Sequence, residues 1–441
     1  MTTAPAEFVS GLPIGSRTRT LLCGSGVFAF AFLGYYFAGP TIFGHDPLGD
    51  SGKPINWLNF FVHLAEAMTH GHLDLRSVGL TGAEHPDLLV KDGNVYLPYG
   101  PTPALLLIPS VLVFGMNDTT QWLHSMVIGA VNVALFWYIL RLLHVSRATQ
   151  LLLVPFFAFG TANFYCATTG TIWFYNHTVA VMFVLFAIVF LLRGVNPAFI
   201  GISLGLALLA RQPAVLSAPF FIYVLVRQRH SDAFDLNWLK DRATLQKVSF
   251  FAAGLAPFVL LFFWYNEVRF GSLLETGLGD LYDKYNGQVY TVYLERFPGG
   301  DRFAEFDWRN IPLHLYTIFL QPPTFTNDGT LFQPSPYGMS AVLTSSPFVY
   351  AFLVRNNKVL RNASWMVIPI VALPTLLYYS QGWVQFGYRY LMDYLPFLMI
   401  LTALGFEENQ SRTSLRIKVL LVVLSVAIGF WGRYWGTRLG W

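Results

Sequence analysis

Charge is scarce in this sequence. Asp, Glu, Lys and Arg together make up 12% of its 441 residues, whereas 54% are hydrophobic and the mean hydropathy is +0.48. A soluble globular domain carries about 25% charged residues. Apolar stretches of about 20 residues, the length that crosses a bilayer as a helix, recur along the chain. Together these properties predict an all-α polytopic membrane protein.

Motifs of several function classes are also missing. The two cysteines, Cys23 and Cys166, lie in or beside apolar segments, so we expect neither a disulfide framework nor a Cys/His zinc site. A net charge of +4 without a basic tail argues against nucleic acid as a partner. The sequence has no Gly-rich phosphate loop, serine nucleophile elbow or HExxH pair. Acidic residues are sparse in the apolar stretches, which argues against an ion-coupled transporter.

Eleven apolar stretches are suitable for spans. A further stretch, residues 101–116, is shorter than a span and contains three prolines, so we expect a re-entrant or interfacial helix there. The first stretch follows Arg17 and Arg19 and is long for a signal-peptide core, so we expect it to be retained. The expected spans lie near residues 20–38, 122–142, 150–166, 171–192, 198–212, 213–226, 248–268, 338–354, 363–380, 388–405 and 417–433.

The distribution of charge predicts the orientation. If 101–116 does not cross, the loops on the side of the N-terminus hold sixteen basic and six acidic residues, and the rest of the chain holds twelve basic and eighteen acidic residues. Basic loops generally face the cytoplasm. We therefore expect a cytoplasmic N-terminus and two large extracytoplasmic segments, 39–121 and 269–337, in a single membrane-embedded domain of residues 1–441.

The first external segment contains an amphipathic stretch, "INWLNFFVHLAEAMTHG" (55–71). Its aromatic and aliphatic residues recur at helical spacing, which predicts a helix lying at the membrane interface with His63 and Glu66 toward water. Most of the acidic residues of this segment are expected to be ordinary solvated loop charges.

A charged pair stands among apolar residues in "QGWVQFGYRYLMDYLP" (381–396). Arg389 and Asp393 are four residues apart, so on a helix they share a face. A charge near bilayer depth is costly and usually faces a cavity or a partner. Two interpretations are open: a cation held at a functional site, or a simple salt bridge that stabilises a helix end.

Three more polar residues are expected at the same level. Arg211 lies in "LLARQPA", and Trp173 and His177 lie in "TIWFYNH". Histidine and tryptophan at this depth serve either as interfacial anchors or as ligand-binding groups. Arginines beside an acidic external loop can hold a lipid phosphate near a general base.

Four stretches in this order resemble a known family: "NFFVHLAEAMTHGHLDL" (59–75), "DGNVYLPYGPTPALLLIP" (92–109), "FGTANFYCATTGTIWFYNH" (159–177) and "GWVQFGYRYLMDYLPF" (382–397), with "RFGSLLETG" (269–277) and "IFLQPP" (318–323) adding to the likeness. The chain is similar to bacterial members of the GT-C superfamily of membrane glycosyltransferases, which includes the dolichyl-phosphate-mannose protein mannosyltransferases.

The resemblance implies an architecture and a reaction. It implies a bundle of about eleven transmembrane helices in the bacterial inner (plasma) membrane, a long first extracytoplasmic loop with juxtamembrane helices, and an extracytoplasmic active site. The donor would be a polyprenyl-phosphate sugar, and the acceptor a hydroxyl of a glycolipid, polysaccharide or protein of the cell envelope. A carboxylate of the first external loop would take the acceptor's proton while arginines neutralise the leaving phosphate.

The resemblance also implies roles for residues. Family members place an acid just before the amphipathic helix, where this sequence has none between Trp57 and Asn59, so the expected bases are Asp50, then Asp46 and Glu66. The donor phosphate would be bound by Arg389 and Arg211, with Asp393 orienting Arg389. His177, Trp173, Tyr99, Gln385 and Tyr388 are expected to contact substrate.

Some alternatives stay open at this point. No spacing demands a metal or other cofactor, although clustered external carboxylates can bind a divalent cation. Because the expected acid near Asn59 is missing, a lipid-phosphate-binding or flipping protein with the same fold but no transferase activity is the principal alternative.

Overall fold

The computed structural model describes residues 14–41, 58–85, 87–231, 234, 236–285, 304–326 and 332–441. This part of the chain is mostly helical, as the composition predicts. Its strands form two short antiparallel pairs, β1 (Leu89–Lys91) with β2 (Asn94–Tyr96) and β3 (Thr324–Phe325) with β4 (Phe332–Gln333). The prediction of an all-α membrane protein is therefore confirmed at the level of fold class.

The expected count of eleven spans is not confirmed. Within the described residues six helices are long and apolar enough to cross a membrane, or seven if the bent pair of α5 (Arg147–Phe159) and α6 (Ala162–Thr169) is one span. The other apolar stretches fold into shorter helices or 3₁₀ turns. The six long helices are α1 (Ile14–Tyr36), α4 (Gln121–Leu142), α7 (Ile172–Arg193), α10 (Arg242–Phe270), α15 (Lys358–Leu377) and α17 (Arg412–Arg438). The shorter ones are α3 (Thr102–Phe114), α8 (Pro197–Leu208), η4 (Gln212–Ser217), α9 (Ala218–Arg227), α14 (Ala341–Thr344), η7 (Ser346–Leu353) and α16 (Leu395–Glu408).

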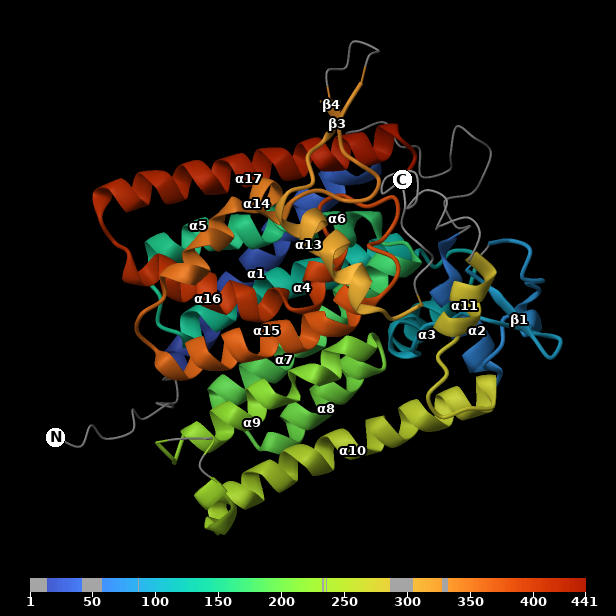
Figure 1. The fold of residues 1–441 in the computed structure, drawn as a ribbon, viewed down its shortest axis with the longest axis horizontal. Coiled ribbons are helices and arrows are strands. Elements are labelled where there is room, and N and C mark those ends of the chain that lie inside the picture. The colour runs from blue at the N-terminus through green and yellow to red at the C-terminus, as the bar shows by residue number, and fades with distance from the viewer. Residues whose placement is uncertain are drawn as a thin grey trace.

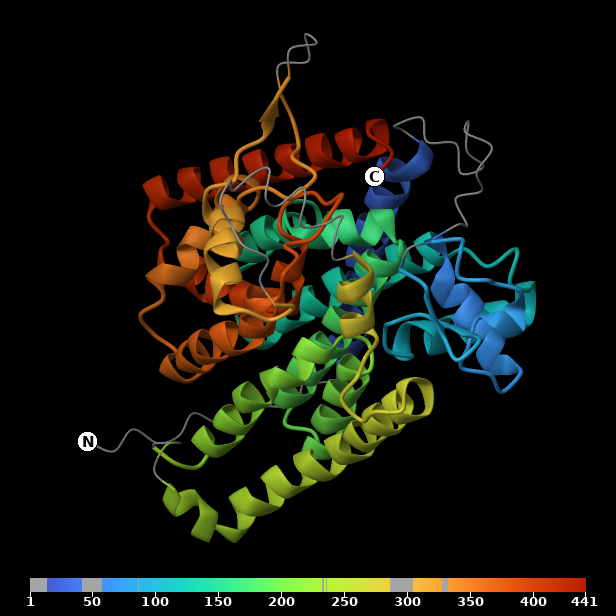
Figure 2. The same cartoon turned by 45° about the vertical axis from the view of Figure 1, so that its right-hand side comes forward.

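Helix α7 lies at the centre of the bundle. From Val179 to Leu192 its sequence is apolar on all sides, and most side chains of α7 are buried against α4, α8 and the turn before α16. By contrast, α10 and α17 lie at opposite edges of the molecule (Figures 1 and 2) and expose most of their apolar side chains. A helix that is apolar all round and buried belongs to the core, whereas exposed apolar helices are those that lipid would cover.

Glycines allow α8 and α10 to pack closely. A Cβ atom on Gly254 would lie 2.1 Å from the backbone oxygen of Ala198, and one on Gly201 would lie 2.1 Å from the backbone oxygen of Phe251. Because membrane helices gain little from hydrophobic burial against each other, small residues that bring backbones together are a main source of packing energy. This contact fixes α10 beside α8.

The described part of residues 39–121, which the charge count predicts to be external and which is called the first external segment below, forms a separate group of elements at one end of the bundle (Figure 2). Helix α2 (Phe60–Thr69) buries Phe60, Phe61 and Leu64 and packs on α3, in agreement with the predicted amphipathic helix. Helix α3 has 13 residues with Pro109 inside it, too few for a straight span, as expected for residues 101–116.

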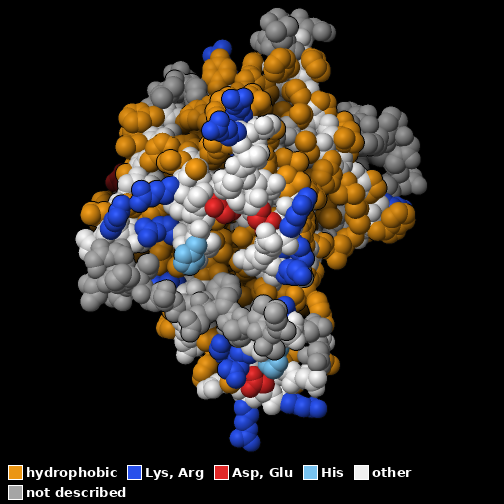
Figure 3. All heavy atoms as spheres, turned by 90° about the vertical axis from the view of Figure 1, so that its left-hand side faces the viewer, with side chains coloured by type: hydrophobic (Ala, Val, Ile, Leu, Met, Phe, Trp, Pro, Cys, Tyr) orange, Lys and Arg blue, Asp and Glu red, His pale blue; other side chains and the backbone are white. Residues whose placement is uncertain are grey.

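The opposite end of the bundle is basic (Figure 3). Helices α10, α15 and α17 begin there, at Arg242, Lys358 and Arg412. These residues belong to the sixteen that the charge count assigns to the cytoplasmic side. The remaining thirteen are Arg17, Arg19, Arg141, Arg147, Arg193, Arg227, Arg229, Lys240, Lys247, Arg355, Arg361, Arg416 and Lys418.

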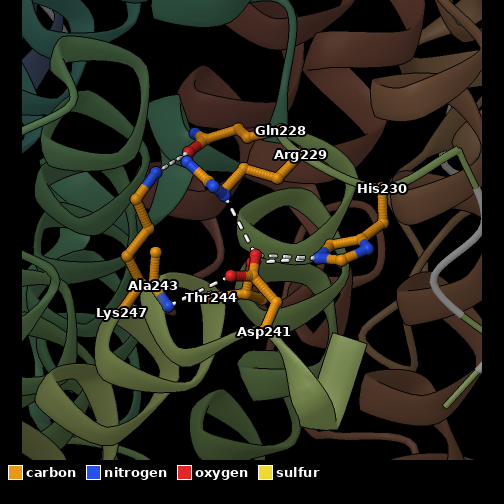
Figure 4. Close-up of polar contacts among 7 residues, drawn as sticks. All are labelled: Gln228, Arg229, His230, Asp241, Ala243, Thr244 and Lys247. Carbon is orange, nitrogen blue, oxygen red and sulfur yellow. Dashed lines mark hydrogen bonds and ion pairs between the residues drawn. The ribbon is translucent and has the colours of Figure 1, made fainter. Parts of the chain in front are cut away.

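Asp241 caps α10 at this end and gathers polar neighbours (Figure 4). Its carboxylate accepts hydrogen bonds from the Thr244 hydroxyl at 2.7 Å and from Arg229 Nε at 3.0 Å, and it lies 3.1 Å from His230 Nε2. The hydrogen bond from Thr244, followed by that from Arg229, holds the pKa of Asp241 well below its usual range. The carboxylate therefore ties the end of α9 to the first turn of α10.

Candidate functional site

A cavity of about 910 Å³ lies at the end of the bundle away from these basic helix starts. The first turns of α7 and the last turns of α15 border it, whereas the basic residues Arg193 and Lys358 lie at the other ends of these two helices. A helix of 20 residues is about 30 Å long, so the cavity and the basic end are separated by roughly the thickness of a bilayer core. Loops from both large external segments complete its wall.

Helix α7 presents three polar or aromatic residues to this cavity. Trp173, Asn176 and His177 are spaced i, i+3 and i+4, which places them on one face. The helix starts at Ile172 because Gly170, in a left-handed conformation at φ +60°, ends α6 and lets the chain turn. Two of the three, Trp173 and His177, are residues expected at the substrate.

Asp393 holds a buried cation next to the cavity. Arg211 Nε and Nη2 donate to the two carboxylate oxygens of Asp393 at 2.7 and 2.8 Å, and His177 Nδ1 lies 3.3 Å from the same carboxylate. The Asp393 side chain is 1% exposed. The pair is therefore bidentate and almost fully desolvated, the geometry that fixes a guanidinium most firmly.

The expected pairing of Arg389 with Asp393 is wrong. Residues Arg389–Asp393 form a 3₁₀ turn, and α16 begins only at Leu395 instead of at residue 388. With three residues per turn, positions i and i+4 do not stack as they do on an α-helix. Asp393 therefore orients Arg211, and Arg389 is held in another way.

Arg389 is a buried cation without a carboxylate partner in the described part of the chain. Its Nη1 donates to the backbone oxygen of Trp383 at 3.3 Å, and its Nε has no protein hydrogen-bond partner there. The guanidinium lies 5.3 to 5.9 Å from the ring centres of Tyr390, Phe174 and Trp173. A buried charge held by rings and a single carbonyl, at the wall of a cavity, leaves capacity to bind an anion.

Asp87 brings a carboxylate of the first external segment to the cavity. Its Oδ2 accepts a hydrogen bond from Trp173 Nε1 at 2.5 Å, and its side chain is 7% exposed. The antiparallel strands β1 and β2 place Leu89 opposite Tyr96. The chain therefore reverses direction after Asp87, and Tyr99 follows on the returning strand's side. Trp173 thus has Asp87 at its indole nitrogen and Arg389 near its ring.

The charges of Asp87, Arg389 and Arg211 all affect the pKa of the Tyr99 hydroxyl. Burial raises the pKa of its hydroxyl well above the usual value, and the negative charge of Asp87 adds to the shift. Arg389 and Arg211 oppose it. The Tyr99 hydroxyl therefore lies within electrostatic range of both the carboxylate and the two arginines. Gly100 makes this possible, since a Cβ there would lie 2.0 Å from the backbone oxygen of Leu209.

Two carboxylates of the second external segment lie on another part of the wall. A Cβ on Gly279 would lie 3.1 Å from Glu275 Oε2 and 3.6 Å from Glu305 Oε2, so the two groups converge on the first turn of α11 (Leu278–Tyr285). Burial raises the pKa of Glu305 to about 7, and the negative charges of Glu275 and Asp283 add to the shift. Glu305 can thus gain or lose a proton near neutral pH.

The other expected site residues have different positions. Gln385 is fully buried and uses its amide to shape its own loop, donating to the backbone oxygens of Gln381 and Tyr337. The Tyr388 hydroxyl lies 2.9 Å from His314 Nδ1, and neither Gln385 nor Tyr388 lines the cavity.

Of the three expected bases, only Glu66 belongs to the described residues, and it does not line the cavity. Glu66 lies on α2, 3.8 Å from His70 Nδ1, and is not part of the cavity wall. Asp46 and Asp50 lie outside the described residues, so their role stays a prediction.

Among the polar residues of the cavity wall that were not predicted as site residues are Asp87, Asn176, Glu275 and Glu305. The hairpin signal Asp92-Gly93 could have indicated Asp87, because a tight turn there folds residues 87 and 99 toward each other. Asn176 shares the helical face of Trp173 and His177, which the spacing alone shows.

Among the described residues, no three His, Cys, Asp or Glu side chains gather in a metal-binding arrangement. The site instead combines a paired arginine, an arginine without a carboxylate and, across Trp173, an acidic group of the first external segment. Comparison of the chain with protein-family models, curated proteins and solved structures finds no match.

Proposed function

We propose that the chain is a membrane glycosyltransferase that moves a sugar from a polyprenyl-phosphate donor to an acceptor hydroxyl in the cavity. The observation that carries the proposal is Arg389, a buried guanidinium at the cavity wall with no carboxylate partner in the described residues. A cation in this state favours an anionic ligand, and a phosphate matches the planar donors of arginine.

The proposed reaction assigns a role to each group. Arg389 binds the donor phosphate, and Arg211, fixed by Asp393, contributes a second positive charge. The bond between the anomeric carbon and the phosphate oxygen breaks as the acceptor oxygen bonds to that carbon. The bonding electrons leave with the phosphate, whose developing negative charge the arginines stabilise. The acceptor's proton goes to a carboxylate.

Asp87 is the proposed base. It belongs to the first external segment, as the resemblance requires, and it lines the same cavity as both arginines. The hydrogen bond from Trp173 holds it across the indole from Arg389. Glu305 is another carboxylate of the wall, and burial raises its pKa to about 7, so Asp87 and Glu305 are compared directly in the test below.

The proposed location follows from the charge distribution. The basic helix ends face the cytoplasm and the cavity opens at the extracytoplasmic face of the bacterial inner membrane. A lipid-linked donor fits this position, because its phosphate sits at the membrane surface while its chain stays in the bilayer.

The first test measures binding of undecaprenyl phosphate to the full-length protein in nanodiscs. Arg389→Gln should weaken binding about tenfold or more, the effect of losing a charge-assisted contact. Arg309→Gln is the matched control, because Arg309 is an exposed arginine that pairs with Asp307 and does not line the cavity. Equal affinity of wild type and Arg389→Gln would remove the basis of the proposal.

The second test measures sugar transfer from a panel of undecaprenyl-phosphate sugars to host membranes. Asp87→Asn should abolish transfer and leave undecaprenyl phosphate bound, whereas Glu305→Gln should retain activity. Loss of transfer in Glu305→Gln alone would move the base to Glu305. Tight binding without transfer of any sugar by the wild type would favour a lipid-phosphate-binding or flipping protein.

A further inference from the structure

The Asn176 side chain is buried and has no hydrogen-bond partner in the described part of the chain. It is 0% exposed and lines the cavity, and neither its Oδ1 nor its Nδ2 has a hydrogen-bond partner among the described residues. Asn163 provides a comparison. It is also 0% exposed, but its Nδ2 donates to the Tyr35 hydroxyl at 2.9 Å and its Oδ1 accepts from Asn132 at 3.4 Å.

An unpaired buried amide lowers stability, because folding removes it from water without replacing its hydrogen bonds. A well-packed core would accept an apolar residue of the same size at this position at no cost. Asn176 contributes to the cavity wall on the face that also carries Trp173 and His177. Because its amide is 0% exposed, a rotation of the side chain toward the cavity is needed before a ligand there supplies the missing hydrogen bonds.

The amide chemistry selects the class of ligand. Asn176 offers an acceptor and two donor positions side by side. A phosphate accepts hydrogen bonds but cannot donate to Oδ1, a metal ion would use only Oδ1, and a hydrocarbon chain would use neither atom. Neighbouring hydroxyl groups donate and accept at the spacing of an amide, so a hydroxylated ring satisfies both atoms together.

The position of Asn176 relative to Arg389 agrees with this class. The Arg389 guanidinium lies 5.6 Å from the ring centre of Phe174 and 5.9 Å from that of Trp173, both one turn or less from Asn176 on α7. One helical turn rises about 5.4 Å, close to the width of a sugar ring. Arg389 and Asn176 border the same cavity, so a sugar attached directly to a phosphate at Arg389 would lie in the space that Asn176 also borders.

We infer that Asn176 binds the hydroxyl groups of the donor's sugar and makes the site selective for a sugar-bearing lipid phosphate over a bare one; the inference rests on the proposed function. Gln381 adds a second group of the same kind. It is 5% exposed, lines the cavity, and its Oε1 has no protein partner among the described residues.

The experiment compares two probes on the full-length protein in nanodiscs. One probe is undecaprenyl phosphate, and the other is whichever of its mannosyl, glucosyl, galactosyl and arabinosyl derivatives the wild type binds most tightly. Asn176→Leu should weaken binding of the sugar-bearing lipid about tenfold and change binding of undecaprenyl phosphate less than twofold. Arg389→Gln should weaken binding of both.

Thermal stability separates a ligand-binding amide from a structural one. Asn176→Leu should leave the melting temperature unchanged or raise it, whereas Asn163→Leu, which removes a paired amide of equal burial, should lower it. If Asn176→Leu does not fold, that result counts against the inference, because it gives Asn176 a structural role. Asn176→Ala then replaces Asn176→Leu in the binding comparison.

Three results would overturn the inference. The first is an equal effect of Asn176→Leu on both probes, or no effect on either. The second is a fall in melting temperature like that of Asn163→Leu. The third is a wild type that binds undecaprenyl phosphate at least as tightly as every sugar derivative. This result would remove the sugar selectivity but would still agree with a phosphate site at Arg389. A wild type that binds no probe refutes the proposed function itself.

Discussion

Asp393 supports the cavity by compensating a buried positive charge, and its removal should be costly. Asp393→Asn keeps the shape of the side chain and one acceptor oxygen but removes the charge that two hydrogen bonds of 2.7 and 2.8 Å connect to Arg211. The Arg211 side chain is only 12% exposed, so water compensates only part of the lost carboxylate. Breaking one partner out of a buried pair costs about 3–5 kcal/mol. We expect a loss of about 3 kcal/mol of unfolding free energy.

The assay is unfolding in mixed micelles by titration with sodium dodecyl sulfate, applied to a double-mutant cycle with Arg211→Gln. In Asp393→Asn the charge of Arg211 is left uncompensated, and Arg211→Gln removes that charge. The loss of unfolding free energy in the double variant should therefore be smaller than the sum of the losses in the two single variants. Asp307→Asn is the matched control, since Asp307 forms a bidentate pair with Arg309, which is 45% exposed, and its loss should cost much less than that of Asp393. Additive effects, or a cost for Asp393→Asn as small as that of the control, would show that Asp393 does not compensate the charge of Arg211.

Two further predictions concern pH and packing. Because the native pKa of Glu305 is about 7 and its ordinary value is 4.5, the native state holds a proton that the unfolded chain releases, and stability falls as pH rises through this interval. Glu305→Gln should therefore stabilise the protein more at pH 8 than at pH 5, and an equal melting-temperature shift at both would contradict this. Gly254→Ala should cost about 1–3 kcal/mol because its Cβ would lie 2.1 Å from the Ala198 backbone oxygen. Gly26→Ala on α1, where a Cβ meets nothing within 4 Å, should be neutral or slightly stabilising, and equal effects of the two would show that the α8–α10 contact is not tight.

The local features of the fold were predictable from sequence. The helical spacing in 55–71 gives α2 and its buried face, and the length and prolines of 101–116 mark a helix too short to span. Apolar composition predicts the membrane class. The number of spans was not predictable, because an apolar stretch does not show where it bends. Residues 150–166, expected as one span, divide at Gly160 and Thr161 into α5 and α6, which meet at 46°.

The sequence predicted several residues that line the cavity, but it did not predict which of them contact one another. Arg211, Arg389, Trp173, His177 and Tyr99 all line the cavity, as expected of substrate-binding residues. The predicted partner of Asp393, Arg389, was wrong because sequence spacing favours a neighbour four residues away. The actual partner, Arg211, is 182 residues distant in the chain. Whether a segment folds as an α-helix or a 3₁₀ turn depends on packing that spacing does not contain.

The central claim is that Arg389 binds the phosphate of a lipid-linked sugar opposite a carboxylate of the first external segment. A density map of the full-length protein with undecaprenyl phosphate tests it most directly. We expect the phosphate within hydrogen-bonding distance of the Arg389 guanidinium, in the cavity that Asp87 also lines. A phosphate bound elsewhere, or at Arg389 with no carboxylate of residues 39–121 near it, would show that Arg389 and Asp87 do not form the proposed donor site.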